Sequence, residues 1–192
     1  MTICHFNRIE IDTVRREKMK QFDRELELGF EVSATEAIKA LTRENMIITH
    51  QDIIYQTWLE EGIVGDYRFR TRIRRTEIER PDMGGSWAGK CEYTTKYSKN
   101  NETAAEQDNM ELNAEITFDE YVQLQKIYRT ADKEETKKIR TYFRTPLDAF
   151  TTYTLDTYPN EEGDRARIEI EFSNKEDMRR YRVPQWLKEL IK

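Results

Sequence analysis

Arginine recurs at every second position of residues 67–74, and this spacing constrains the fold more than any other feature of the chain. The segment reads Tyr-Arg-Phe-Arg-Thr-Arg-Ile-Arg. Successive side chains of a β-strand point to opposite faces, so the arginines share one face and the strand-favouring residues share the other. The cationic row consists of Arg68, Arg70, Arg72 and Arg74. Like charges in a row repel one another, so the row needs water or nearby anions.

The same alternation recurs in other segments of the chain, where every second residue is charged and the residues between them are apolar. A solvated outer face is the simplest interpretation of any one such strand. Several rows on one sheet favour a site for a polyphosphate and its metal ions, because arginine binds phosphate oxygens bidentately and hard divalent ions prefer carboxylates. The cationic rows add Lys138, Arg140 and Arg144; the acidic rows contain Glu25, Glu27, Glu31, Glu169 and Glu171; mixed rows contain Lys90, Glu92, Lys96, Glu111, Asn113 and Glu115.

These patterns predict eight strands and three helices. The strands are expected over residues 24–32, 51–59, 66–75, 88–97, 109–117, 137–144, 148–157 and 165–172. The capping boxes Ser33/Glu36, Thr117/Glu120 and Ser173/Glu176 predict helices over 34–45, 118–129 and 174–181. Turn signals at Glu61-Gly62 and at 159–164 favour antiparallel pairing. We therefore predict an α+β fold, in which an eight-stranded antiparallel β-barrel encloses the charged rows and helices pack outside.

Composition favours one domain of ordinary size within 192 residues. Residues 1–23 read as an N-terminal extension, and 24–192 as the single tunnel domain. Charged residues make up 36% of the chain, yet the net charge is only −5, which argues against binding duplex DNA by bulk charge. Two cysteines without ligand spacing indicate a reducing compartment. No apolar run suits a signal peptide or membrane span, so a cytoplasmic protein without membrane contact is expected.

Nine short motifs follow one another from Arg24 onward. They are Glu25-Leu26-Glu27-Leu28-Gly29-Phe30, Gln56-Thr57-Trp58-Leu59, Arg68 to Arg74, Thr94-Thr95-Lys96, Glu111 to Ile116, Lys138-Ile139-Arg140, Asp148-Ala149-Phe150, Glu169-Ile170-Glu171-Phe172 and Pro184-Gln185-Trp186-Leu187. In the order of these motifs the chain resembles the CYTH superfamily, the triphosphate tunnel metalloenzymes, which include class IV adenylate cyclases and thiamine triphosphatases. The resemblance implies a tunnel that holds a triphosphate among basic residues and divalent metals on glutamates.

The resemblance also implies a substrate and roles for individual residues. The expected partner is a triphosphate-containing small molecule, such as inorganic triphosphate or a nucleotide, or an RNA 5′ end. The expected cofactor is Mg²⁺ or Mn²⁺. Substrate binding would fall to Arg68, Arg70, Arg72, Arg74, Lys96, Lys138 and Arg140, and metal binding to Glu25, Glu27, Glu111, Glu169 and Glu171. These residues would hold the triphosphate while a metal positions the attacking group.

Two positions depart from the family pattern. Gly29 stands where the family has a basic residue, and Asn113 stands where it has an acid. An asparagine oxygen binds a hard dication more weakly than a carboxylate does. These departures favour an alternative function, a non-catalytic module of the same fold that binds or sequesters a nucleotide or RNA end. Restoring both side chains, with Gly29→Lys and Asn113→Glu, is then expected to raise turnover.

Two further features have structural interpretations. Residues 84–91 match a phosphate-binding P-loop except that Cys91 replaces the serine or threonine. Strand-like residues follow this segment, so a hairpin loop is the better interpretation, since a P-loop opens a helix. Among the tryptophans, Trp58 and Trp186 are expected to pack in the core, and Trp87 is left open as a base-stacking residue. Residues 184–187 are expected to form a short lid anchored by Trp186.

Overall fold

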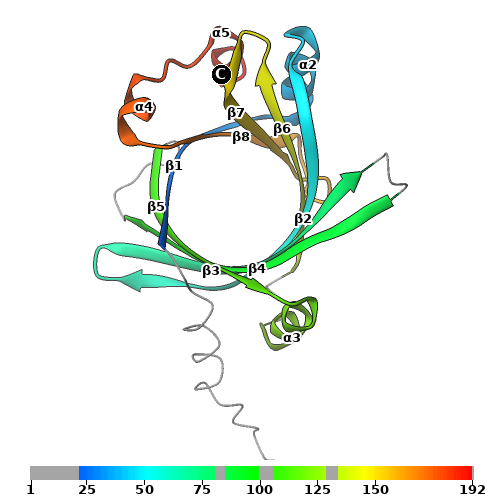
Figure 1. Cartoon of the computed structure of the whole chain (residues 1–192), viewed down its shortest axis with the longest axis vertical. Coiled ribbons are helices and arrows are strands. Elements are labelled where there is room, and N and C mark those ends of the chain that lie inside the picture. The colour runs from blue at the N-terminus through cyan, green and yellow to red at the C-terminus, as the bar shows by residue number, and fades with distance from the viewer. Residues whose placement is uncertain (1–21, 81–84, 100–105, 129–133, 192) are drawn as a thin grey trace, which may run out of the picture.

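The computed structural model, which describes residues 22–80, 85–99, 106–128 and 134–191, is a closed antiparallel barrel (Figure 1). Its strands follow one another around the barrel in the order β1-β5-β4-β3-β2-β6-β7-β8. They are β1 (Phe22–Ser33), β2 (Ile47–Val64), β3 (Tyr67–Arg80), β4 (Gly85–Lys99), β5 (Glu106–Ile116), β6 (Thr136–Thr145), β7 (Asp148–Thr157) and β8 (Arg165–Phe172). The α+β fold predicted from the sequence is confirmed.

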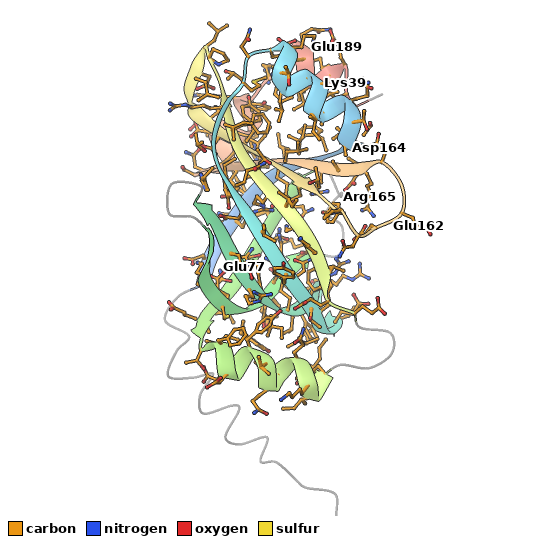
Figure 2. The ribbon with its side chains drawn as sticks, turned by 90° about the vertical axis from the view of Figure 1, so that its right-hand side faces the viewer. Lys39, Glu77, Glu162, Asp164, Arg165 and Glu189 are labelled. Carbon is orange, nitrogen blue, oxygen red and sulfur yellow. The ribbon has the colours of Figure 1, made fainter. Side chains whose placement is uncertain are left out.

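The helices pack on the outside of this barrel, as predicted. They are α2 (Ala34–Arg43), α3 (Phe118–Tyr128), α4 (Lys175–Arg180) and α5 (Gln185–Lys188). Helix α2 begins as its capping box predicts, because the backbone N–H of Glu36 donates to Ser33 Oγ. The turn before β8 adds a second cap, in which Asp164 accepts from the Thr35 backbone N–H at 2.8 Å (Figure 2). Helix α3 shows the full reciprocal box between Thr117 and Glu120.

The hydrophobic core lies between the barrel wall and these helices, because the outward parity of each strand is apolar. One cluster covers β6, β7 and β8 and includes Phe143, Tyr153, Leu155, Ile168 and Ile170 together with Trp186 and Leu187. A smaller cluster under α3 contains Leu59, Ile73, Cys91, Tyr93 and Tyr121. With its apolar side chains outside, the barrel turns the charged parity of every strand into the lumen.

The structure corrects three details of local structure. Strand β2 runs through Glu61 and Gly62, and the turn falls at Gly65, whose φ of 59° suits glycine. Gly62 is instead required by space, since a Cβ there would lie 2.7 Å from the Phe69 ring. Helix α4 is capped by Asn174, whose side chain accepts from the Asp177 backbone N–H, one residue later than predicted.

The C-terminal segment anchors as expected but does not form a lid. Trp186 packs edge-on against Phe143 and Tyr153, both of which point out of the barrel. Helix α5 therefore lies against the outer wall and not across the lumen (Figure 1). Among the described residues, none of the helices is long and apolar enough to cross a membrane.

Two expectations fall partly or wholly outside the described residues. Most of the predicted extension, residues 1–21, is not described, and neither is the side chain of Trp87. The P-loop-like segment is described from Gly85, where it enters strand β4 and no helix. Residues 85–91 are therefore part of a strand, where the sequence predicted a hairpin loop.

Candidate functional site

The lumen of the barrel is a continuous surface of charged side chains drawn from all eight strands. Their alternation on β3 and β4 places the arginine row beside Lys96, and the acidic rows of β1 and β8 lie side by side across the barrel. The lumen divides into two cavities, of about 680 Å³ and about 260 Å³, which we call the wide chamber and the narrow chamber. The residues shared by both, which we call the belt, are Glu27, Arg72, Lys96, Lys138 and Glu169.

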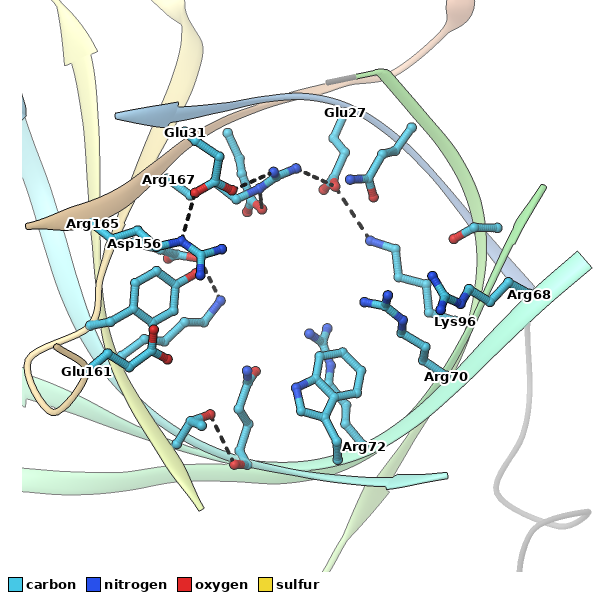
Figure 3. A pocket seen from close by; sticks show the side chains of 18 of the residues that line it. Glu27, Glu31, Arg68, Arg70, Arg72, Lys96, Asp156, Glu161, Arg165 and Arg167 are labelled. Carbon is cyan, nitrogen blue, oxygen red and sulfur yellow. Dashed lines mark hydrogen bonds and ion pairs between the residues drawn. The ribbon is translucent and has the colours of Figure 1, made fainter. Parts of the chain in front are cut away.

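The wide chamber carries an excess of cationic groups (Figure 3). Eight lysines and arginines face five carboxylates there. They are Arg68, Arg70, Arg72, Lys96, Lys99, Lys138, Arg165 and Arg167 against Glu27, Glu31, Asp156, Glu161 and Glu169. Among the described residues Arg68 forms no ion pair, and Arg70 reaches only Glu61, at 3.7 Å. This chamber is therefore suited to an anion.

The narrow chamber has the opposite balance, with seven carboxylates and six cationic side chains. Its arginines are already neutralised by close partners. Arg74 donates to Glu92 at 2.8 Å, and Arg140 donates to Glu169 at 2.6 Å and to Asp156 at 2.7 Å. A phosphate entering this chamber would have to replace these buried ion pairs.

The predicted substrate-binding residues are therefore brought to one lumen but not to one chamber. Arg68 and Arg70 line only the wide chamber, and Arg74 and Arg140 line only the narrow one. The remaining three, Arg72, Lys96 and Lys138, belong to the belt. Of the predicted metal ligands, Glu27 and Glu169 belong to the belt, and Glu25, Glu111 and Glu171 line the narrow chamber.

Three of the predicted metal ligands, Glu25, Glu27 and Glu111, surround the ammonium group of Lys96. The ammonium of Lys96 lies 2.5 Å from Glu25, 3.6 Å from Glu27 and 3.8 Å from Glu111. Within the described part of the chain, no three acidic, histidine or cysteine side chains are already grouped to hold a metal ion.

The donor set nevertheless fits a hard divalent cation. The buried Oε1 of Glu111 has no hydrogen-bond partner, and carboxylate oxygens are the ligands that Mg²⁺ and Mn²⁺ prefer. Burial raises the pKa of Glu171, and the charges of Glu25 and Glu169 raise it further. A bound cation would give the Glu111 oxygen a partner and would stabilise the charged form of Glu171.

The pKa values of two belt residues are shifted because the neighbouring side chains do not fully compensate their charges. Burial lowers the pKa of Lys138 to about 8, helped by the charge of Arg140 and despite a 2.6 Å ion pair with Asp156. Burial, followed by the charge of Glu169, raises the pKa of Glu27 to about 7. An anion beside Lys138 and a cation beside Glu27 would restore both charged forms.

Sequence reasoning missed several lumen residues. Asp156 is 1% exposed and accepts hydrogen bonds from both Lys138 and Arg140. Arg167 bridges Glu27 and Glu169. Both could have been predicted from alternation, because Asp156 lies two residues after Thr154 on β7 and Arg167 lies two residues before Glu169 on β8. Trp58 was predicted to pack in the core, but it lines the wide chamber, with the guanidinium groups of Arg70 and Arg72 5.8 and 5.6 Å from its ring centre.

Asn113, the second departure from the family pattern, supports a neighbouring carboxylate. Its side-chain oxygen accepts a 2.8 Å hydrogen bond from Thr94, and its NH₂ group donates to Glu111 at 3.4 Å. It lines neither chamber. Asn113 therefore belongs to a hydrogen-bonded chain that runs from Thr94 to Glu111.

Comparison with known proteins relates the barrel to solved structures. No protein-family model matches the chain, and no curated protein matches it. The PH1819 protein of Pyrococcus horikoshii OT3 superposes with a TM-score of 0.50 and 18% identity, covering 80% of this chain and 82% of that one. HpAC1 from Hippeastrum, described as having a dominant triphosphatase activity, gives 0.52 and 15%, covering 81% and 82%. At these identities the likeness shows a shared fold, which is the barrel that the sequence predicted.

Proposed function

We propose that the protein binds the triphosphate group of a small molecule or an RNA 5′ end in the wide chamber and hydrolyses it with the help of Mg²⁺ or Mn²⁺. The observation that carries this proposal is the uncompensated cationic wall formed by Arg68 and Arg70. The likeness of the barrel to HpAC1, a protein described as a triphosphatase, supports it.

The arginines and lysines of the wide chamber and belt would hold the phosphate oxygens. Arg68, Arg70 and Arg72 would bind along one side together with Lys96 from the adjacent strand β4, and Lys138 would contribute from β6. Charge-assisted hydrogen bonds to phosphate are short and strong, and a fixed cationic wall also offsets the charge that develops when a phosphoanhydride bond breaks.

The metal would lie on the carboxylate side of the same lumen, on Glu25, Glu27, Glu111, Glu169 and Glu171. When bound, it would act as a Lewis acid toward the phosphate oxygens. The chain itself contributes the other features. Lys96 balances the carboxylates, and Asn113 donates a hydrogen bond to Glu111.

A non-catalytic binding module remains the second candidate function. It is favoured by Asn113, which presents a hydrogen-bonded amide where the family has an acid. Trp58 offers its ring to the wide chamber in either case, so a nucleoside attached to the triphosphate could stack there.

A thermal-shift series with tripolyphosphate, ATP and pyrophosphate, each with Mg²⁺, Mn²⁺ or EDTA, tests the proposal, because a ligand that binds only the native state raises the unfolding temperature. We expect stabilisation by triphosphates and stronger stabilisation with metal. Release of inorganic phosphate in the same mixtures separates hydrolysis from binding alone. No stabilisation by any triphosphate would overturn the proposed function.

A further inference from the structure

A glycine interrupts the acidic row that β1 turns toward the lumen. The row reads Glu25, Glu27, Gly29 and Glu31. The backbone does not require this glycine, because only Gly65 and Gly163 have positive φ among the described glycines. The requirement is one of space. An ideal Cβ on Gly29 would lie 1.9 Å from Nη2 and 2.4 Å from Cζ of Arg167.

A side chain at position 29 would therefore displace the guanidinium of Arg167, which is the far end of a flexible side chain, from its present position. Arg167 belongs to β8, where Glu169 pairs with Gly29 across the ladder. From there it reaches three carboxylates. Its Nε donates to Glu169 at 2.8 Å, and its terminal nitrogens lie 3.2 Å from Glu31 and 3.7 Å from Glu27 (Figure 3).

This arrangement corrects the expectation that Gly29 leaves the lumen without a cation at this point. The cation is present and comes from the neighbouring strand. Burial opposes the charge of Arg167, but the surrounding carboxylates, Glu169 first, raise the pKa of its guanidinium above the usual value. The group is therefore permanently charged and cannot serve as a proton acceptor.

We propose that Arg167 binds phosphate in the wide chamber, where phosphate oxygens would replace its longer contacts to Glu31 and Glu27, and that the absence of a side chain at Gly29 leaves room for its guanidinium. The proposal rests on the proposed function, because it adds one residue to the same anion site. It also reverses the expected effect of Gly29→Lys. The new side chain would collide with the guanidinium of Arg167 instead of adding a missing cation.

The physical part of the proposal can be tested without a ligand. Thermal unfolding is compared for the natural protein, Gly29→Ala, Arg167→Ala and the double variant. We expect Gly29→Ala to lower the unfolding temperature by roughly 2–4 °C or more when Arg167 is present. The same change should have no such effect after Arg167→Ala, because the colliding group is gone. Equal effects in both backgrounds would overturn the proposal.

The functional part is tested by calorimetric titration with tripolyphosphate in EDTA. Arg167→Ala and Gly29→Lys should each weaken binding tenfold or more. The double variant Gly29→Lys/Arg167→Ala should bind more tightly than either single variant, because a lysine then supplies the cation from β1. Arg180→Ala is the control. Arg180 lies on helix α4 outside the barrel and its side chain is 75% exposed, so its removal should change the affinity by less than about twofold.

The outcomes separate the two proposals. If the natural protein does not bind tripolyphosphate, the proposed function fails and the role of Arg167 in phosphate binding fails with it, while the unfolding comparison still decides the steric coupling. If the natural protein binds and Arg167→Ala binds equally well, only the role of Arg167 is wrong. A double variant that binds no better than Arg167→Ala would also overturn it.

Discussion

The wide and narrow chambers draw on largely the same strands, yet the wide chamber presents Arg68 and Arg70, whereas the narrow chamber pairs Arg74 and Arg140 with carboxylates. The β3–β4 register explains the difference. Arg74 lies directly opposite Glu92, whereas Arg70 lies opposite Lys96 and Arg68 opposite Ser98. Like charges directly opposite one another are destabilising, so this part of the sheet has an unfavourable interaction that a bound anion would relieve. The availability of an arginine in the row for a ligand is thus decided by its cross-strand neighbour.

The largest expected effect concerns the boundary between the chambers, where Asp156 neutralises Lys138 and Arg140. Asp156→Asn keeps the shape of the side chain but removes the close counter-ion of the buried Lys138 and leaves Arg140 with Glu169 alone. Removing one partner of a buried ion pair costs about 3–5 kcal/mol, so the free energy of unfolding measured in urea should fall by that order. Glu161→Gln, on the exposed rim of the wide chamber, is the control and should change it by less than about 0.5 kcal/mol.

The pH dependence of stability provides a second measure of the same group. Burial opposes ionisation of Asp156, but the hydrogen bonds from Arg140 and its charge hold the pKa near 2. A carboxyl with a depressed pKa contributes its stability above the unfolded value of about 3.9 and loses it as the pH falls. The natural protein should therefore lose stability below pH 4 more steeply than Asp156→Asn does. If stability falls equally with pH in both proteins, the stability of the belt does not depend on the charge of Asp156.

The next effect compares one arginine from each chamber. Arg70→Ala should weaken tripolyphosphate binding about ten- to a hundredfold, since a charge-assisted hydrogen bond contributes about 1.5–3 kcal/mol. Arg74→Ala should leave the affinity within about twofold and instead lower stability, because the buried Glu92 then keeps only the exposed Lys90 as a partner. Calorimetry and urea unfolding of both variants give the two readouts. Equal losses of affinity would show that the chambers do not differ in phosphate binding.

Much of the fold could be predicted because a single rule, alternation, governs every strand. All eight strands and three of the four helices follow from it together with the capping boxes. The errors arose where local signals compete with tertiary packing. Glu61-Gly62 looks like a turn in sequence, but Gly62 makes room for Phe69 and the strand continues. Trp58 looks like a core residue, but it stands at one of the alternate positions of β2 whose side chains face the lumen.

The division of the lumen could not be predicted, because it depends on register across strands that are distant in sequence. Nothing in the local sequence of β3 distinguishes Arg70 from Arg74, and the distinction comes from Glu92 on β4. Gly29 illustrates the same limit. Its sequence context indicates a missing cation, and only the diagonal approach of Arg167 from β8 shows that the space is filled.

A smaller effect is expected for the metal, whose proposed ligands lie mostly in the narrow chamber. Glu171→Gln should weaken Mn²⁺ binding to the tripolyphosphate complex by roughly tenfold, because the affinity of hard cations follows the charge of the ligand set. Glu161→Gln removes a carboxylate from the wide chamber and should leave Mn²⁺ affinity unchanged. Titration calorimetry measures both. If the two variants lose affinity equally, the metal does not favour the narrow chamber.

The smallest expected effect is the pH dependence of anion binding at the belt. The pKa of Lys138 is lowered to about 8 by burial and by Arg140, so the ammonium is present at neutral pH and is lost as the pH rises through that value. A bound phosphate favours the ammonium, so tripolyphosphate affinity in EDTA should fall by about three- to tenfold between pH 7 and 9.5. Lys138→Arg keeps its charge over this range and corrects for titration of the ligand itself. The natural protein should therefore lose affinity more steeply than this variant, whereas equal slopes would exclude Lys138 from the anion site and confine phosphate binding to the arginines of the wide chamber.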